Sequence, residues 1–145
     1  MLQRLFTVNE ANRLLVQVRP LLVDLVETRC AMDAVIRDMH RMQQLYHASR
    51  GRPAPGLRAS LEGGLERLAE LDARLQGRAE ELAGHGLAVR DPARGLVDFP
   101  TILEGQPAYL CYLLGESRVS HWHLVGEGFP ERRPLEGPGN PPPEV

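Results

Sequence analysis

The sequence predicts an α+β protein with a long antiparallel helical hairpin, a small antiparallel β-meander of three or four strands, and a disordered proline-rich tail. Apolar residues recur at alternating intervals of three and four between positions 11 and 46, which is typical of a helix that lies against another helix. After Gly86 short apolar runs alternate with turns, as strands do. We expect one α+β domain over residues 1–133, with the hairpin at 7–84, the meander at 87–124 and the tail at 134–145.

Composition narrows the classes of function. The net charge of −2 gives no general attraction to nucleic acid or to an anionic membrane, and there are no aromatic platforms for bases beside the arginines of the hairpin tip. All basic residues are arginine, which excludes a lysine nucleophile. The N-terminus lacks the apolar core of a signal peptide, no apolar run is long enough to span a membrane, and the two cysteines form no disulfide framework. We therefore expect a cytoplasmic protein.

A capping box starts the first helix. The Thr7 hydroxyl can accept from the amide of Glu10, while the Glu10 carboxylate reaches back to the Thr7 amide. Pro20 lies inside the helical pattern and removes a backbone donor, so it should kink the helix nearby. The unbroken spacing across Pro20 favours one kinked helix over two helices at 8–18 and 20–46.

The apolar stripe of this helix is wider than one partner needs. A second row runs beside it, formed by Leu15, Leu22, Val26 and Ile36. A hairpin alone would leave this row in water, so we expect a homodimer in which the row of helix one packs against a second copy.

A second helix should follow a turn. Residues 47–56 are rich in Gly and Pro, and leucines then recur every seven residues at positions 61, 68, 75 and 82. Gly84-His85-Gly86 is a stop signal. The pattern indicates a helix over 57–84 that pairs with the first; the alternative is a parallel zipper dimer made by this helix alone.

Four short segments are predicted to form strands. They are separated by turns with Gly and Pro in standard places, and the third is the strongest. The segments are Leu87–Arg90, Leu96–Phe99, Ala108–Leu114 and Val119–Leu124.

Reactive side chains concentrate on these strands. His121 and His123 share a face because side chains alternate along a strand, and Cys111 is on the preceding strand. Asp98 and Glu116 flank the strands at turns, so two histidines with a thiol or carboxylates could bind zinc or another transition metal.

The register of the hairpin decides whether this set can meet. A two- or four-residue loop after Leu114 pairs the histidines with Leu110 and Tyr112, whereas a three-residue loop with a bulge pairs them with Cys111. In the alternative without a site, Cys111 is a small buried hydrophobe and the histidines are surface or hydrogen-bonded groups.

Several segments together resemble an uncharacterised bacterial family, domain of unknown function 2203. The segments that carry the likeness are Phe6–Leu15, Val18–Leu22, Gly95–Pro100, Tyr109–Tyr112, Leu114–Glu116, Trp122-His123, Gly128-Phe129 and Arg132. The resemblance implies a small cytoplasmic protein with a helical pair and a C-terminal β region, and it implies no activity.

The chain departs from the pattern of that family in three places. The family usually has a tryptophan at Tyr112, a polar residue at Leu113 and often an aromatic at His121. The resemblance therefore makes His123, Cys111, Asp98, Glu116 and Arg132 better candidates than His121.

Two functions follow from these patterns. The first, which we favour, is a self-associating helical-hairpin interaction module whose β region is a cap or a docking patch for a protein partner; the sequence leaves enzymatic activity undecided and favours its absence. The second is a small metal-binding protein, with hydrolysis by a metal-bound water as the chemistry it would offer. Its metal ligands would be drawn from His121, His123, Cys111, Asp98 and Glu116, and Arg132 would bind an anion beside the metal.

Overall fold

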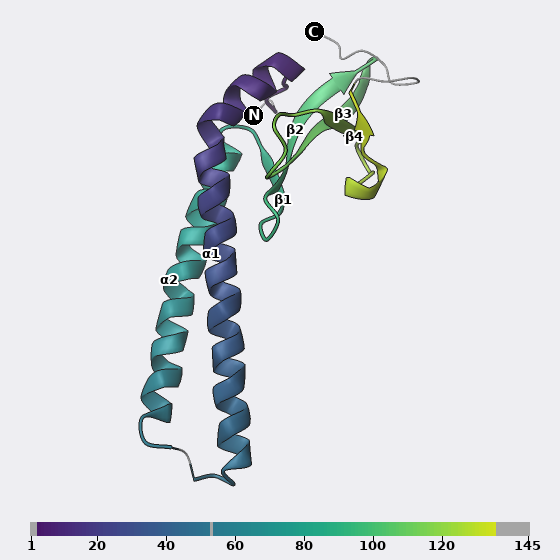
Figure 1. The fold of residues 1–145 in the computed structure, drawn as a ribbon. Helices are drawn as coiled ribbons and strands as arrows, with labels where there is room; N and C mark the ends of the chain where they lie inside the picture. Colours follow the sequence, from purple (N-terminus) through teal and green to yellow (C-terminus); the bar gives the residue numbers. More distant parts are fainter. Residues whose placement is uncertain (1–2, 53, 136–145) are drawn as a thin grey trace. The chain divides into compact units, whose positions relative to one another are not determined.

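The computed structural model describes residues 3–52 and 54–135, and it confirms two helices followed by an antiparallel sheet (Figure 1). The two helices are α1 (Val8–Ala48) and α2 (Leu57–Gly84). The strands are β1 (Ala88–Asp91), β2 (Leu96–Leu103), β3 (Gln106–Leu113), β4 (His121–Leu124) and β5 (Arg133–Pro134), with a short 3₁₀ turn, η1 (Phe129–Glu131), before the last.

The chain forms two compact units. The sheet unit contains residues 3–26 and 78–135, and the hairpin unit contains Glu27–Gly77, so both helices run through both units. The expectation of one domain over residues 1–133 stays a prediction. In the described part of the chain, no helix is long and apolar enough to cross a membrane.

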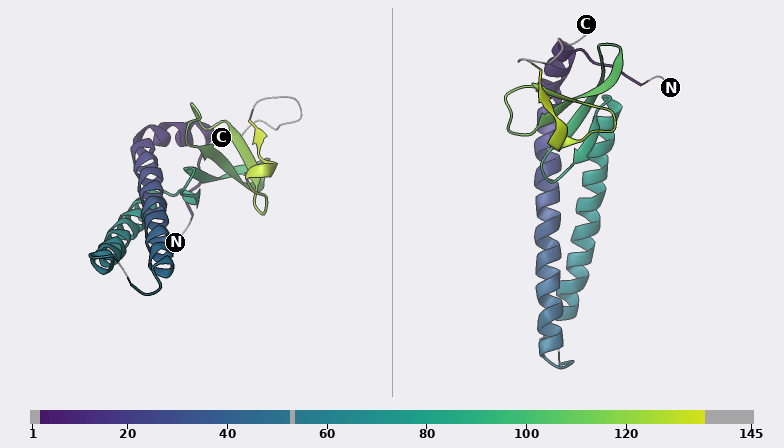
Figure 2. Two further views of the ribbon diagram at one scale, coloured as in Figure 1. Left: turned by 60° about the horizontal axis from the view of Figure 1, so that its bottom comes forward. Right: turned by 90° about the vertical axis from the view of Figure 1, so that its right-hand side faces the viewer.

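Helix α1 is a single helix that contains Pro20, as the spacing predicts. Its N-terminal part, drawn in purple, bends in the left view of Figure 2. The capping box is present: the Thr7 amide donates to Glu10 Oε1 at 3.2 Å, and the Glu10 amide donates to Thr7 Oγ1 at 3.1 Å. The helix therefore continues through Pro20 without ending there.

The hairpin unit contains the C-terminal part of α1 and the N-terminal part of α2, which lie side by side and antiparallel (Figures 1 and 2). A Cβ on Gly64 would lie 3.0 Å from Cγ of Met39, so the missing side chain makes room for this methionine. Among the described residues of the unit, only Thr28 and Leu71 are buried, and the other apolar residues of the seam between the two helices are half-buried or exposed. Two helices alone therefore cover their apolar seam incompletely.

The sheet has five antiparallel strands in the order β1-β2-β3-β4-β5, whereas three or four were predicted. β5 is only two residues long and contains Pro134, so its sequence reads as tail rather than strand. Leu135 is buried beside it, and its amide donates to the Ser120 carbonyl at 2.9 Å. The rest of the predicted tail, residues 136–145, lies outside the described residues.

β2 continues through Pro100, where the sequence suggested an end. β1 pairs with β2 only from Leu96 to Asp98, so Pro100 has no β1 partner and its missing N–H breaks no bond on that side. Its carbonyl instead accepts from the Phe6 amide at 2.8 Å. β2 is then long enough to pair with all of β3 through the two-residue turn Glu104-Gly105, in which both φ angles are positive.

The apolar row of α1 is buried unequally. Leu15 is 2% exposed and Leu22 is fully buried within the sheet unit, whereas Ile36 in the hairpin unit is 49% exposed. The assumption that a hairpin leaves the whole row in water is therefore wrong for Leu15 and Leu22, because the fold of the sheet unit already covers them. The width of the stripe no longer requires a second copy there.

Candidate metal centre

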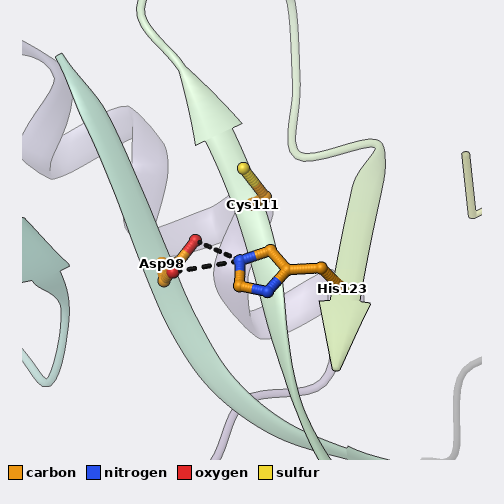
Figure 3. A group of neighbouring side chains, drawn as sticks. All are labelled: Asp98, Cys111 and His123. Atoms are coloured by element: carbon orange, nitrogen blue, oxygen red, sulfur yellow. Dashed lines mark hydrogen bonds and ion pairs between the residues drawn. The ribbon is translucent and has the colours of Figure 1, made fainter. Parts of the chain in front are cut away.

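Asp98, Cys111 and His123 come together on one face of the sheet, each from a different strand (Figure 3). The register pairs Cys111 with Asp98 on one side and with His121 on the other. In this register the histidines share the face of Cys111. The sequence predicts it for a three-residue loop with a bulge, whereas the connection in the structure is longer and spans residues 114–120. All three side chains are buried, and their nitrogen, oxygen and sulfur atoms lie within 4.8 Å of one another. We call them the Asp–Cys–His group.

The ring of His123 is held at both nitrogens. Nε2 lies 3.1 Å from each carboxylate oxygen of Asp98, and Nδ1 lies 3.0 Å from the carbonyl oxygen of Leu124. Both partners are oxygen acceptors, so each contact needs a proton. A neutral imidazole carries only one N–H and can supply one of them.

Asp98 is fixed from the other side by Arg90. Arg90 Nε donates to Asp98 Oδ2 at 2.9 Å, and its guanidinium lies over the ring of Tyr109 at 4.9 Å. Asp98 is only 2% exposed. A buried carboxylate needs such partners, and here a guanidinium and an imidazole provide them.

Cys111 is a protonated thiol in this environment. Burial, followed by the nearby charge of Asp98, raises the pKa of Cys111 to about 11. The opposing influence is Arg132, whose Nη1 lies 3.9 Å from Sγ and lowers the pKa. The thiol is therefore a poor nucleophile at neutral pH, because the thiolate is the reactive form.

The other predicted site residues form a second network beside the group. Arg132 donates from Nη1 and Nη2 to the two carboxylate oxygens of Glu116, each at 2.9 Å, and Glu116 Oε1 also accepts from the Leu113 amide. Burial raises the pKa of Glu116, but the bonds from Arg132 and Leu113 outweigh it and leave the pKa below its ordinary value. The Arg132 fork expected to bind an anion is thus already occupied by Glu116.

His121 belongs to this second network. Its Nδ1 lies 3.0 Å from Ser120 Oγ and 3.5 Å from Glu116 Oε2. Burial, together with the charge of Arg132, lowers the pKa of His121. Among the described residues the structure does not bring His121 or Glu116 into the Asp–Cys–His group.

A cavity of about 360 Å³ opens over the group. Asp98, Cys111 and His123 line it, together with Arg90, Tyr109 and the loop from Val125 to Phe129. Glu127 in this loop is held by Arg133 through two bonds of 2.9 Å, which, with the Leu124 amide, lower the pKa of Glu127. The group is therefore buried and still borders on space for a small ligand.

Sequence reasoning missed Arg90, Tyr109 and the 125–129 loop. Arg90 occupies the irregularity in the β1–β2 pairing between Val89 and Asp91. Strict alternation along a predicted strand does not describe such a position. Tyr109 was detectable, since it lies two residues before Cys111 and so shares its face.

A family model described as an uncharacterized conserved protein, DUF2203, matches residues 4–135. The chain belongs to this family. The match includes both helices, the sheet and every residue of the candidate centre. No curated protein and no solved structure matches the chain. Membership in the DUF2203 family therefore brings no activity with it, and function has to be argued from the site.

Proposed function

We propose that this protein binds a divalent transition metal, zinc or a similar ion, through Asp98, Cys111 and His123. The observation that carries the proposal is the setting of His123, with Nδ1 on a backbone carbonyl and Nε2 facing Asp98. Histidines that bind metals are usually oriented by an N–H bond of the second nitrogen to such a carbonyl. A metal at Nε2 would also remove the need for a second ring proton.

The distances suit a tetrahedral site. With metal bonds of about 2.0 Å, neighbouring nitrogen and oxygen ligands lie roughly 3.3 Å apart. Nε2 and the Asp98 oxygens are 3.1 Å apart. Neighbouring sulfur and nitrogen ligands lie roughly 3.5 Å apart, so a group that spans at most 4.8 Å needs only a small contraction.

The neighbours of each ligand also suit a metal. Arg90 holds Oδ2 of Asp98 and leaves Oδ1 available, while Arg132 lies near the sulfur of Cys111 and favours its thiolate. A thiolate and a carboxylate would balance the two positive charges of the ion. Such surrounding contacts orient ligands and tune the metal.

Three protein ligands leave the fourth tetrahedral position open, and here it would face the cavity. A bound ion would act there as a Lewis acid and lower the pKa of a bound water, and hydrolysis is the reaction class that such water serves. Without an ion the group offers little chemistry, because the thiol is protonated and His123 has both nitrogens engaged.

The test is the zinc content of untagged protein after loading and removal of free ion. We expect about one zinc ion per chain in the wild type and loss of this zinc in His123→Ala, because one of three ligands is gone. His121→Ala is the matched control, since this residue lies on the same strand outside the group, and it should keep its zinc. A zinc-free wild type, or full zinc in His123→Ala, would overturn the proposal.

We also propose self-association of the hairpin unit with a second copy of the chain. The supporting observation is the incompletely covered seam, in which Thr28 and Leu71 are the only buried residues among those described. Leu65 and Ile36 add exposed apolar surface, at 57% and 49%. Four antiparallel helices would cover such a seam as a bundle does.

A further inference from the structure

The cavity over the Asp–Cys–His group has a charge balance that changes when an ion binds. Arg90 makes its ion pair with Asp98. Two other arginines, Arg94 and Arg132, stack on the ring of Phe129, and each has its own carboxylate partner. Arg94 pairs with Asp91, and Arg132 pairs with Glu116. A divalent ion would use the charges of Asp98 and the Cys111 thiolate. Arg90 would then be the guanidinium without a compensating charge.

The walls of the cavity define the kind of anion that could restore this balance. Leu96, Val125 and the rings of Tyr109 and Phe129 supply the apolar part of the lining, and Glu127 is neutralised by Arg133. One excess positive charge calls for a monoanion, and a carboxylate matches the planar fork of a guanidinium. A volume of about 360 Å³ lies near the lower end of ligand pockets, so the molecule must be small.

Arg90 is placed to contact such a ligand. Its side chain is 43% exposed while its Nε is bonded to the buried Asp98, so the guanidinium reaches from the group toward solvent. A guanidinium has five N–H donors, and the bond from Nε to Asp98 uses one of them.

We propose that the metal-loaded cavity binds a small organic carboxylate, with one carboxylate oxygen on the ion, Arg90 on the other, and the hydrocarbon part between Tyr109 and Phe129. This inference rests on the proposed metal centre. It adds the ligand class and the residue that selects it.

The experiment uses full-length protein loaded with Co²⁺, whose visible spectrum reports a change of ligands at the ion. Benzoate, acetate and inorganic phosphate are titrated in turn. Benzoate should bind most tightly, because its ring fills the apolar part of the cavity. Phosphate binding more tightly than both carboxylates would overturn the inference in favour of an inorganic anion site.

Two variants isolate the contribution of Arg90. In Arg90→Gln, benzoate affinity should fall more than about tenfold, the loss expected for a charge-assisted hydrogen bond, at saturating Co²⁺. Arg94→Gln is the matched control. It removes an equal charge beside Phe129 but leaves the partner of Asp98 intact, so benzoate affinity should change less than about twofold.

The two proposals fail in distinguishable ways. If wild-type protein takes up no Co²⁺, the metal centre and the carboxylate site are both refuted. If Co²⁺ binds but benzoate does not alter its spectrum, or binds equally well to Arg90→Gln, the metal centre stands and the carboxylate site is refuted.

Discussion

At the scale of single residues, the environment of Cys111 decides what chemistry the group can perform. The side chain is 1% exposed and its pKa is raised to about 11 by burial and by the charge of Asp98. A metal ion offers the sulfur a positive partner that the metal-free protein provides only weakly through Arg132, at 3.9 Å. Metal binding and deprotonation of this thiol should therefore occur together.

The reactivity of Cys111 gives a prediction at this scale. In metal-free native protein at pH 8, iodoacetamide should modify the exposed Cys30 and leave Cys111 intact, because the thiolate is the reactive form. The rate at Cys111 should rise as the pH approaches about 11. Mass spectrometry of the separated peptides measures both rates.

The same pKa has a consequence for stability, with a definite sign. The folded protein holds the Cys111 proton above the ordinary pKa of 9.0, so the stability from this group is complete below pH 9.0 and is lost as the pH rises through about 11.

The Cys30→Ser variant provides the control for the iodoacetamide experiment, because Cys111 is then the single thiol. Rapid modification of Cys111 at pH 8 would contradict the buried, protonated thiol.

At the scale of elements, the sequence predicts most of the fold but not the register that makes the site. The capping box of Thr7 and Glu10, the continuity of α1 across Pro20 and the order of helices before strands follow from local patterns. The pairing of Cys111 with His121 depends on a seven-residue connection whose path is set by tertiary contacts. One such contact is the Val119 amide, which donates to Asn12 Oδ1 on α1 at 2.7 Å.

Self-association is a property of the helical elements and is tested there. We expect a sedimentation mass of twice the 16.1 kDa chain. Ile36→Glu or Leu65→Glu should shift it toward the monomer, because each places a charge in the apolar surface proposed to contact the second copy. Both residues are exposed, so the single chain should stay folded.

Gln44→Glu is the control for these substitutions. It adds the same charge at an exposed position of α1 that is already polar, and the dimer should persist. Circular dichroism checks the helix content of each variant. A wild-type mass of 16.1 kDa at all concentrations would contradict self-association.

At the scale of the whole molecule, the two units have different characters. The sheet unit buries Leu15, Leu22, Phe99 and Tyr112 and contains the complete candidate centre. The hairpin unit buries almost none of its described side chains. We therefore assign the proposed chemistry to the sheet unit and the proposed assembly to the hairpin unit.

The candidate centre could be predicted only in part from the sequence. The sequence predicts Asp98, Cys111 and His123 as candidate metal ligands, because their residue types and strand positions suit a metal. Arg90 and the cavity could not be predicted, since they depend on the irregular β1–β2 pairing and on the path of the 125–129 loop. The sequence also does not show that the two histidines belong to different networks. The ring of His121 lies beside Glu116, whereas the ring of His123 lies beside Asp98.

X-ray absorption at the zinc edge of the loaded protein tests the metal centre most directly. We predict one sulfur ligand at about 2.3 Å and nitrogen or oxygen ligands at about 2.0 Å, with the sulfur lost in Cys111→Ser. A wild-type spectrum without sulfur, or one that Cys111→Ser leaves unchanged, would show that the ion binds elsewhere and would contradict the centre formed by Asp98, Cys111 and His123.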